Sequence, residues 1–126
     1  MKTIKQEYII DAPIEKVWRA FVDPKEIEKW GGGPAKMDGR DGTKFKLWGG
    51  DIHGTNTKVV ENKILEQDWF GGDWSEPSKV QFVLSEEKGK TKVELFQENV
   101  PAAEVNDIDD GWRRYYLGPM KNYLEK

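Results

Sequence analysis

Large apolar side chains recur every three or four residues along the last quarter of the chain. They are Val105, Ile108, Trp112, Tyr116, Met120 and Tyr123. This spacing places them on one face of a helix of about five turns, and such a face has to be buried against another element. Gly118 and Pro119 lie inside this stretch. Because proline lacks an amide donor and clashes with the preceding turn, we expect a kink near Tyr115.

The chain begins with a strand pattern, which two helical patterns follow. Residues 3–10 alternate in polarity, as in a strand with one wetter face. Asp11 is the expected N-cap of a first helix. The apolar stripe of that helix is Ile14, Val17, Trp18, Phe21 and Val22. Asp23 is expected to cap a second short helix, with Glu26 as its capping-box partner, and the glycine run 31–34 ends it.

The middle of the chain is typical of antiparallel strands joined by glycine-bearing turns. We expect a weak strand at 35–37, followed by strands at 43–47, 52–60 and 63–69. A hairpin then pairs the strand of Val80, Phe82 and Leu84 with the strand of Val93 and Leu95. The intervening stretch 70–77 is expected to be an exposed loop that holds two large aromatic side chains.

This order of elements predicts an α+β fold with one domain spanning residues 1–126. We expect a curved antiparallel sheet of about six or seven strands, with two short helices after the first strand. A strongly twisted sheet cannot bury its concave face against itself, and only the C-terminal helix is long enough to fill it. Any mismatch between this helix and the sheet would leave a cavity.

Composition excludes several classes of protein. The chain has no cysteine, so it has no disulfide and no thiolate chemistry. Its formal net charge is −3, with basic and acidic residues interspersed, so we expect no nucleic-acid partner and assign Lys44 and Lys46 to a solvated strand face. No apolar run is long enough for a membrane helix or signal peptide. We therefore expect a cytoplasmic protein without a membrane partner.

The sequence contains little that indicates catalysis. His53 is the only histidine and lies two residues after Asp51, a pair that could orient a general base. No nucleophile elbow accompanies it, and one imidazole with scattered carboxylates lacks the ligand spacing of a zinc site. The glycine runs lack the strand–turn–helix context of phosphate-binding loops. We therefore expect no enzyme activity, no metal and no cofactor.

Tryptophan is unusually frequent, with six copies in 126 residues. It suits cores, pockets and interfaces alike, and plain core packing is the favoured explanation for most of these rings. Three aromatic groups, together with His53, are candidates for a ligand or interaction site. They are Trp112, Tyr115 and Tyr116 on the terminal helix, Trp69, Phe70 and Trp74 around the glycine-bearing loop, and Trp30 and Trp48 at one rim of the same opening.

Three segments carry a resemblance to a known family. They are DAPIEKVWRAFVDPKEIEKW, GGDIHGTNTKVVENKILEQDW and GWRRYYLGPMKNYLEK. Together they resemble the activator of ninety-kilodalton heat-shock protein ATPase homologue family, over about residues 4–124. That family belongs to the START-like (SRPBCC) superfamily, which shares the helix-grip fold of the birch-pollen allergen. The chain is similar to the C-terminal domain of the eukaryotic co-chaperone, in which a separate N-terminal domain makes the main chaperone contact.

The resemblance implies a helix-grip fold and a binding role. The first hypothesis is a non-catalytic, chaperone-associated stress protein whose partner is the ninety-kilodalton heat-shock chaperone. Because the chain starts directly at the first strand, we expect binding to this chaperone without full ATPase stimulation. The second hypothesis is a carrier or sensor of a small apolar molecule held between the helix and the sheet. A polyketide-cyclase-like enzyme ranks third, because only fold-level analogy supports it.

Overall fold

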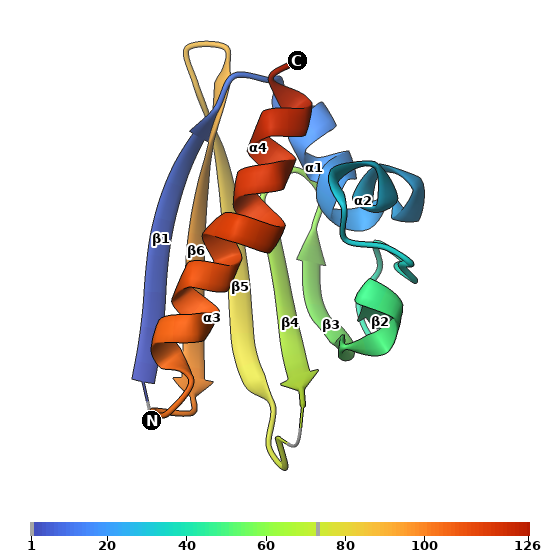
Figure 1. The fold of residues 1–126 in the computed structure, drawn as a ribbon. Helices are drawn as coiled ribbons and strands as arrows, with labels where there is room; N and C mark the ends of the chain where they lie inside the picture. The colour runs from blue at the N-terminus through green and yellow to red at the C-terminus, as the bar shows by residue number, and fades with distance from the viewer. Residues whose placement is uncertain (1, 73) are drawn as a thin grey trace.

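The computed structural model describes residues 2–72 and 74–126, in which one antiparallel sheet is covered by helices on one face (Figure 1). The strands are β1 (Lys2–Ile10), β2 (Lys44–Leu47), β3 (Ile52–Val60), β4 (Ile64–Gly71), β5 (Ser78–Glu87) and β6 (Lys90–Val100). The helical elements are α1 (Ile14–Val22), α2 (Pro24–Trp30), the turn η1 (Trp48–Gly50), α3 (Val105–Gly111), the turn η2 (Trp112–Tyr116) and α4 (Leu117–Leu124).

The six strands lie in the order β1-β6-β5-β4-β3-β2, and every neighbouring pair is antiparallel. The expected hairpin is present, with Phe82 opposite Leu95 and Leu84 opposite Val93. Figure 1 shows the continuous run of α3, η2 and α4 lying across one face of this sheet, which we call the inner face. The predicted α+β helix-grip architecture, with two short helices after β1, is therefore confirmed. No helix in the described parts of the chain is long and apolar enough to span a membrane.

The terminal helix contains a π turn where the sequence predicts a kink. The Leu117 N–H donates to the carbonyl oxygen of Trp112, five residues earlier, and Tyr116 departs from helical geometry with φ −119° and ψ −82°. One extra residue is thus accommodated in the turn before Pro119. The disruption lies at the expected place, and it is a widened turn rather than a simple proline kink.

Of the two expected helix caps, one is wrong and the other is confirmed. Asp11 does not cap α1: the N-cap is Pro13, where the chain is still extended, and Asp11 lies three residues before the first helical residue, Ile14. Asp23 does cap α2, and its Oδ1 accepts from the Lys25 N–H at 2.9 Å. The expected capping box is absent from the described bonds, since Glu26 pairs with Lys29 at 3.1 Å instead.

Two strand predictions are corrected in extent. The segment expected as a weak strand at 35–37 forms only an isolated bridge between Lys36 and Lys46. The expected loop 70–77 begins later than predicted, because β4 continues through Gly71, and residue 73 within it lies outside the described residues. Phe70 therefore lies on a strand rather than in a loop. Its side chain points to the face of the sheet opposite that of its neighbour Trp69.

The core lies between the inner face of the sheet and the helices. Inward-facing Phe82 and Leu95 are completely buried, and so are Phe21 of α1, Leu117 and Met120 of α4. Phe21 and Phe82 pack with ring centroids 4.6 Å apart, which joins α1 to the middle of the sheet. The terminal helix thus closes a core to which both layers contribute aromatic rings.

Replacement of Gly118 by alanine is expected to destabilise the fold strongly. A Cβ at this position would lie 1.9 Å from the carbonyl oxygen of Arg113, the residue five positions earlier across the π turn. Because a backbone atom cannot move aside cheaply, we expect Gly118→Ala to lower the free energy of unfolding by about 2 kcal/mol or more in urea denaturation.

The matched control is Gly111→Ala, on the same helical run. Gly111 has helical φ −59°, and the nearest atom to an added Cβ is Tyr115 Cδ2 at 3.9 Å. Alanine favours helix over glycine, so this variant is expected to be neutral or more stable by up to about 1 kcal/mol. Equal losses in the two variants would contradict the role assigned to the π turn.

Candidate functional site

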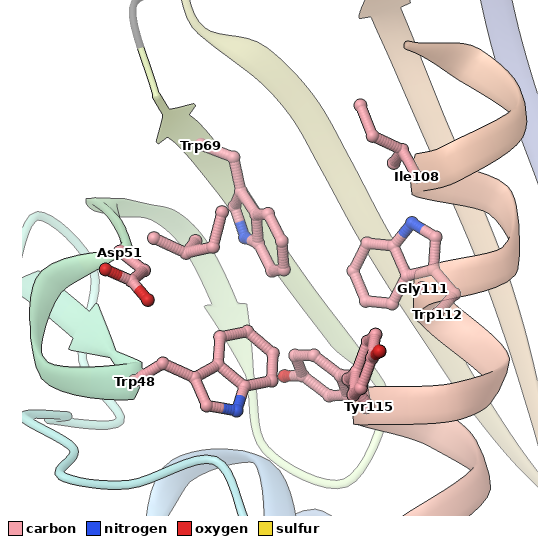
Figure 2. Close-up of a pocket in the computed structure, with 9 residues that line it drawn as sticks. Trp48, Asp51, Trp69, Ile108, Gly111, Trp112 and Tyr115 are labelled. Carbon is pink, nitrogen blue, oxygen red and sulfur yellow. The ribbon is translucent and has the colours of Figure 1, made fainter.

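A pocket of about 330 Å³ opens between the terminal helix and the β2–β4 end of the sheet (Figure 2). Its lining consists of Trp48, Asp51, Ile52, Trp69, Ile108, Gly111, Trp112, Tyr115 and Tyr116. In Figure 2, Trp48 and Asp51 lie on the side opposite Ile108 and Trp112 of the helical run. The cavity expected from the mismatch between helix and sheet is therefore present, and it is lined mainly by aromatic rings.

A series of buried hydrogen bonds fixes the indole ring of Trp112. Its Nε1–H donates to Gln97 Oε1 at 2.8 Å, and Gln97 Nε2 donates to Ser78 Oγ at 3.0 Å. The Ser78 hydroxyl in turn donates to the carbonyl oxygen of Glu98 at 2.6 Å. Trp112, Gln97 and Ser78 are all buried, so the atoms that make these hydrogen bonds are paired where water cannot replace a lost partner.

A second series of buried hydrogen bonds fixes the indole ring of Trp69 in the same way. Its Nε1–H donates to Gln67 Oε1 at 2.7 Å, and Gln67 Nε2 donates to Asn56 Oδ1 at 2.8 Å. Asn56 Nδ2 then donates to the carbonyl oxygen of Asp38 at 2.9 Å. The ring centroids of Trp69 and Trp112 lie 4.8 Å apart. The two series of hydrogen bonds therefore fix one corner of the pocket wall together.

Trp48 forms the rim on the glycine-rich side. It is half-buried in η1 with φ +48°, and its Nε1–H donates to the carbonyl oxygen of Gly31 at 2.9 Å. The Trp30 ring packs edge-on against it, with centroids 6.4 Å apart. Trp30 itself does not line the pocket, because its Nε1–H donates to the carbonyl oxygen of Ala20 and this bond holds the ring between α1 and α2.

Tyr116 lies at the centre of the aromatic cluster behind the pocket. Its ring packs at 4.7 Å from Trp30 and 4.9 Å from Trp112, and only 1% of the residue is exposed. Its hydroxyl has no hydrogen-bond partner, and burial raises the pKa of this phenol far above its ordinary value. The hydroxyl is therefore a neutral group at physiological pH.

The mouth of the pocket carries the exposed polar groups. Tyr115 points out of the core with 63% of its surface exposed, and Asp51 is exposed on the other side (Figure 2). Among residues 2–72 and 74–126, no three His, Cys, Asp or Glu side chains cluster as metal ligands would. The lining as a whole offers apolar ring surface with exposed polar groups confined to the mouth.

His53 and Phe70 lie on the outer face of the sheet, away from the pocket. They occupy opposed positions on β3 and β4, and their rings stack at 5.6 Å. Successive strand residues point to opposite faces, so Ile52 and Trp69 reach the pocket whereas His53 and Phe70 cannot. They border a separate groove, of about 510 Å³, with Lys36, Lys44 and Lys46.

Trp74 lies outside the pocket lining. Its Nε1–H donates to Glu104 Oε2 at 3.0 Å, which joins the segment after β4 to the residue before α3. Of the candidate residues, the structure brings together Trp48, Trp69, Trp112, Tyr115 and Tyr116. Trp30 packs against Tyr116 without lining the pocket, and His53, Phe70 and Trp74 lie outside the lining.

The buried glutamines are the main site feature that our sequence analysis did not identify. Gln67 and Gln97 occupy inward positions next to apolar inward residues, namely Leu65 and Trp69 on β4 and Val93 and Leu95 on β6. A polar residue at such a position signals a buried hydrogen bond, because burying an unpaired amide is costly. The pattern could have indicated a fixed partner, although it could not have indicated which ring.

Comparison with known proteins places this geometry in a family. The family model described as "Activator of Hsp90 ATPase homolog 1-like protein" matches residues 11–125. This chain belongs to that family. The resemblance inferred from the sequence is therefore confirmed.

Individual relatives are similar over nearly the whole chain. It is 25% identical to the activator of 90 kDa heat shock protein ATPase homolog of Dictyostelium discoideum, over 96% of this chain and 32% of the relative. It is 25% identical to homolog 1 of Homo sapiens, over 94% of this chain and 35% of the relative. This family member thus spans about a third of the length of these curated relatives.

A solved structure confirms the fold. The crystal structure of an HSP90 activator from Plasmodium falciparum superposes with a TM-score of 0.89 at 24% identity, over 98% of this chain and 96% of the other. At this level of identity the likeness concerns the fold alone, and it shows that this family member shares the fold of that protein.

The hydrogen bond from Trp112 to Gln97 leads to a prediction about stability. Gln97→Met keeps the size of the side chain but leaves the buried indole N–H without an acceptor, so we expect a loss of about 1–3 kcal/mol in the free energy of unfolding. The Nε1–H resonance of Trp112 should shift in the NMR spectrum.

Gln81→Met on the neighbouring strand serves as the control. Gln81 is half-buried and donates to Glu66 Oε1 at 3.1 Å on the outer face. Because water can replace this partner, the loss should stay within about 0.5 kcal/mol. An unaltered indole resonance in Gln97→Met would contradict the hydrogen-bond chain.

Proposed function

We propose that this protein is a non-catalytic binding protein whose macromolecular partner is a ninety-kilodalton heat-shock chaperone, and that it acts in the cytoplasm as a chaperone-associated stress protein. The observation that carries the proposal is the family match over residues 11–125, with relatives named as activators of this chaperone's ATPase. The proposal is limited to binding and does not include stimulation of the ATPase, because the chain spans only about a third of the length of those relatives.

The rim of the pocket is the surface we assign to this contact. Among the described residues, Tyr115 and Ile9 are the large hydrophobic residues that are exposed, at 63% and 38%. Tyr115 lies beside the apolar pocket, whereas Ile9 lies on β1 at the far edge of the sheet. Exposed tyrosines next to an apolar hollow are typical anchors of protein interfaces.

Titration of the ¹⁵N-labelled protein with the chaperone from the same organism is expected to shift or broaden resonances around Tyr115. Tyr115→Ser should weaken the binding at least fivefold, because an interface anchor is worth 1 kcal/mol or more. The stability of the variant should change by no more than about 0.5 kcal/mol, since Tyr115 is exposed.

Ile9→Ser is the matched control, because it removes the other exposed apolar side chain. It should leave chaperone binding unaltered. An absence of spectral change in the wild-type protein at near-millimolar chaperone would refute the chaperone proposal itself. Equal weakening by both variants would refute only the assigned surface.

We propose a second function, the binding of a small apolar molecule, and the pocket specifically favours it. Its volume of about 330 Å³ lies at the lower end of the range for ligand sites. The indole N–H groups of Trp48, Trp69 and Trp112 are all engaged by the protein, so apolar ring surface is left to face a ligand. The hydrogen bonds also fix the positions of these rings before a ligand arrives.

Tetralin, a neutral bicyclic hydrocarbon, is a suitable first probe. Added up to its solubility limit, it is expected to shift the Nε1–H resonances of Trp48, Trp69 and Trp112 but not that of Trp18. Ile108→Trp should abolish these shifts by filling the pocket. Asn106→Trp, at an exposed position of the same helix, should leave them in place. Retained binding in the filled variant would place the probe elsewhere and contradict the proposal.

A further inference from the structure

The Tyr116 hydroxyl is the one buried side-chain polar atom without a hydrogen-bond partner in residues 2–72 and 74–126. Proteins pair nearly all buried polar groups, because an unpaired donor in an apolar setting loses the bonds it would make in water. Phenylalanine would fill the same core position without that loss. The hydroxyl therefore calls for an explanation outside the packing of the free protein.

The neighbouring rings do not provide a partner. Trp48, Trp69 and Trp112 direct their N–H groups to Gly31, Gln67 and Gln97, so their only polar hydrogens are engaged elsewhere. The rings closest to Tyr116 are those of Trp30, Trp112 and Phe82, at 4.7, 4.9 and 5.6 Å between centroids. Tyr116 thus contributes to the pocket lining a residue whose hydroxyl is the one buried side-chain polar atom left unpaired among the described residues.

We propose that Tyr116 donates a hydrogen bond to an acceptor oxygen on a neutral, ring-bearing ligand of the pocket. The inference rests on the proposed small-molecule function and adds the chemical class of the ligand. That class is an aromatic or alicyclic ring system carrying one ketone or ether oxygen. The rings of the ligand pack on Trp69 and Trp112, and its oxygen is directed toward Tyr116.

Charge and protonation favour this class. Burial raises the pKa of Tyr116, so its oxygen keeps the proton and offers it as a donor. The buried part of the lining contains no cationic group that would offset an anionic ligand, and the exposed Asp51 carboxylate at the mouth repels anions. A neutral acceptor fits both conditions.

Access to the hydroxyl requires a local movement of the wall, because no solvent reaches it in the free protein. Trp48 is the element placed for this movement. It is half-buried, it lies on a three-residue turn ahead of Gly49 and Gly50, and its ring packs edge-on to Tyr116 at 6.1 Å. One side-chain hydrogen bond, to Gly31, holds it in place. The ligand is therefore expected to displace the Trp48 ring.

The experiment compares two probes of nearly the same shape, tetralin and 1-tetralone, which differ by one carbonyl oxygen. NMR titration of the full chain, followed at the indole Nε1–H resonances, gives both affinities. The wild-type protein is expected to bind 1-tetralone about three- to tenfold more tightly than tetralin, the range for one net hydrogen bond. The Trp48 resonance should show the largest shift.

Tyr116→Phe removes the proposed donor, and the ratio of the two affinities should then fall to about one. Tyr115→Phe removes the hydroxyl at the rim and should preserve the wild-type ratio. The unfolding temperature of Tyr116→Phe should equal or exceed that of the wild type, because the hydroxyl has no partner in the free protein. A lower unfolding temperature would reveal a structural partner and overturn the inference.

The remaining outcomes separate the inference from the function on which it rests. If tetralin binds but the ketone has no advantage, or if its advantage survives in Tyr116→Phe, the pocket binds apolar molecules and the role of Tyr116 is wrong. If neither probe shifts any indole resonance, the small-molecule function fails and the inference fails with it.

Discussion

The packing of the Tyr116 ring against the inner face of the sheet is the interaction on which the rest of the structure depends. This ring meets Trp30 of α2, Phe82 of β5 and Trp112 of the same helical run, with centroids 4.7 to 5.6 Å apart. It therefore joins the short helices, the sheet and the terminal helix at one point. Aromatic pairs contribute about 0.5–1.5 kcal/mol each beyond the area they bury, so such a junction stabilises the short helices, the sheet and the terminal helix together.

The π turn makes this junction possible. Trp112, Tyr116 and Met120 are spaced four residues apart, and on a regular α-helix each step of four rotates the side chain about 40° further around the axis. The extra residue within η2 offsets this drift, so Tyr116 and Leu117 are both buried while Tyr115 is exposed. Gly118 permits the widened turn because a side chain there would meet the Arg113 carbonyl oxygen. The local irregularity thus decides which tyrosine enters the core and which remains at the pocket rim.

The sequence predicted the features that depend on periodicity and missed those that depend on strand boundaries or on partners. The terminal stripe and the pairing of Phe82 with Leu95 follow from the periods of helices and strands. Phe70 was misplaced because β4 continues two residues beyond Trp69, and a one-residue step along a strand moves a side chain to the other face. Asp11 failed as a cap because Pro13 keeps the chain extended. The contacts of Gln67 and Gln97 could not be predicted, since each depends on a ring distant in the sequence or on a cross-strand partner.

Those two glutamines also explain why the aromatic cluster leaves a pocket instead of closing completely. Large rings beside a hollow gain dispersion energy by tilting into it. For Trp69 and Trp112 such a tilt would break the bonds from their indole nitrogens to Gln67 and Gln97, and it would leave buried donors unpaired. The hydrogen bonds of the two glutamines thus oppose the closing of the pocket that the packing of the apolar rings favours. The walls of the pocket are thus fixed in advance, and this preorganisation favours both of the functions that we propose.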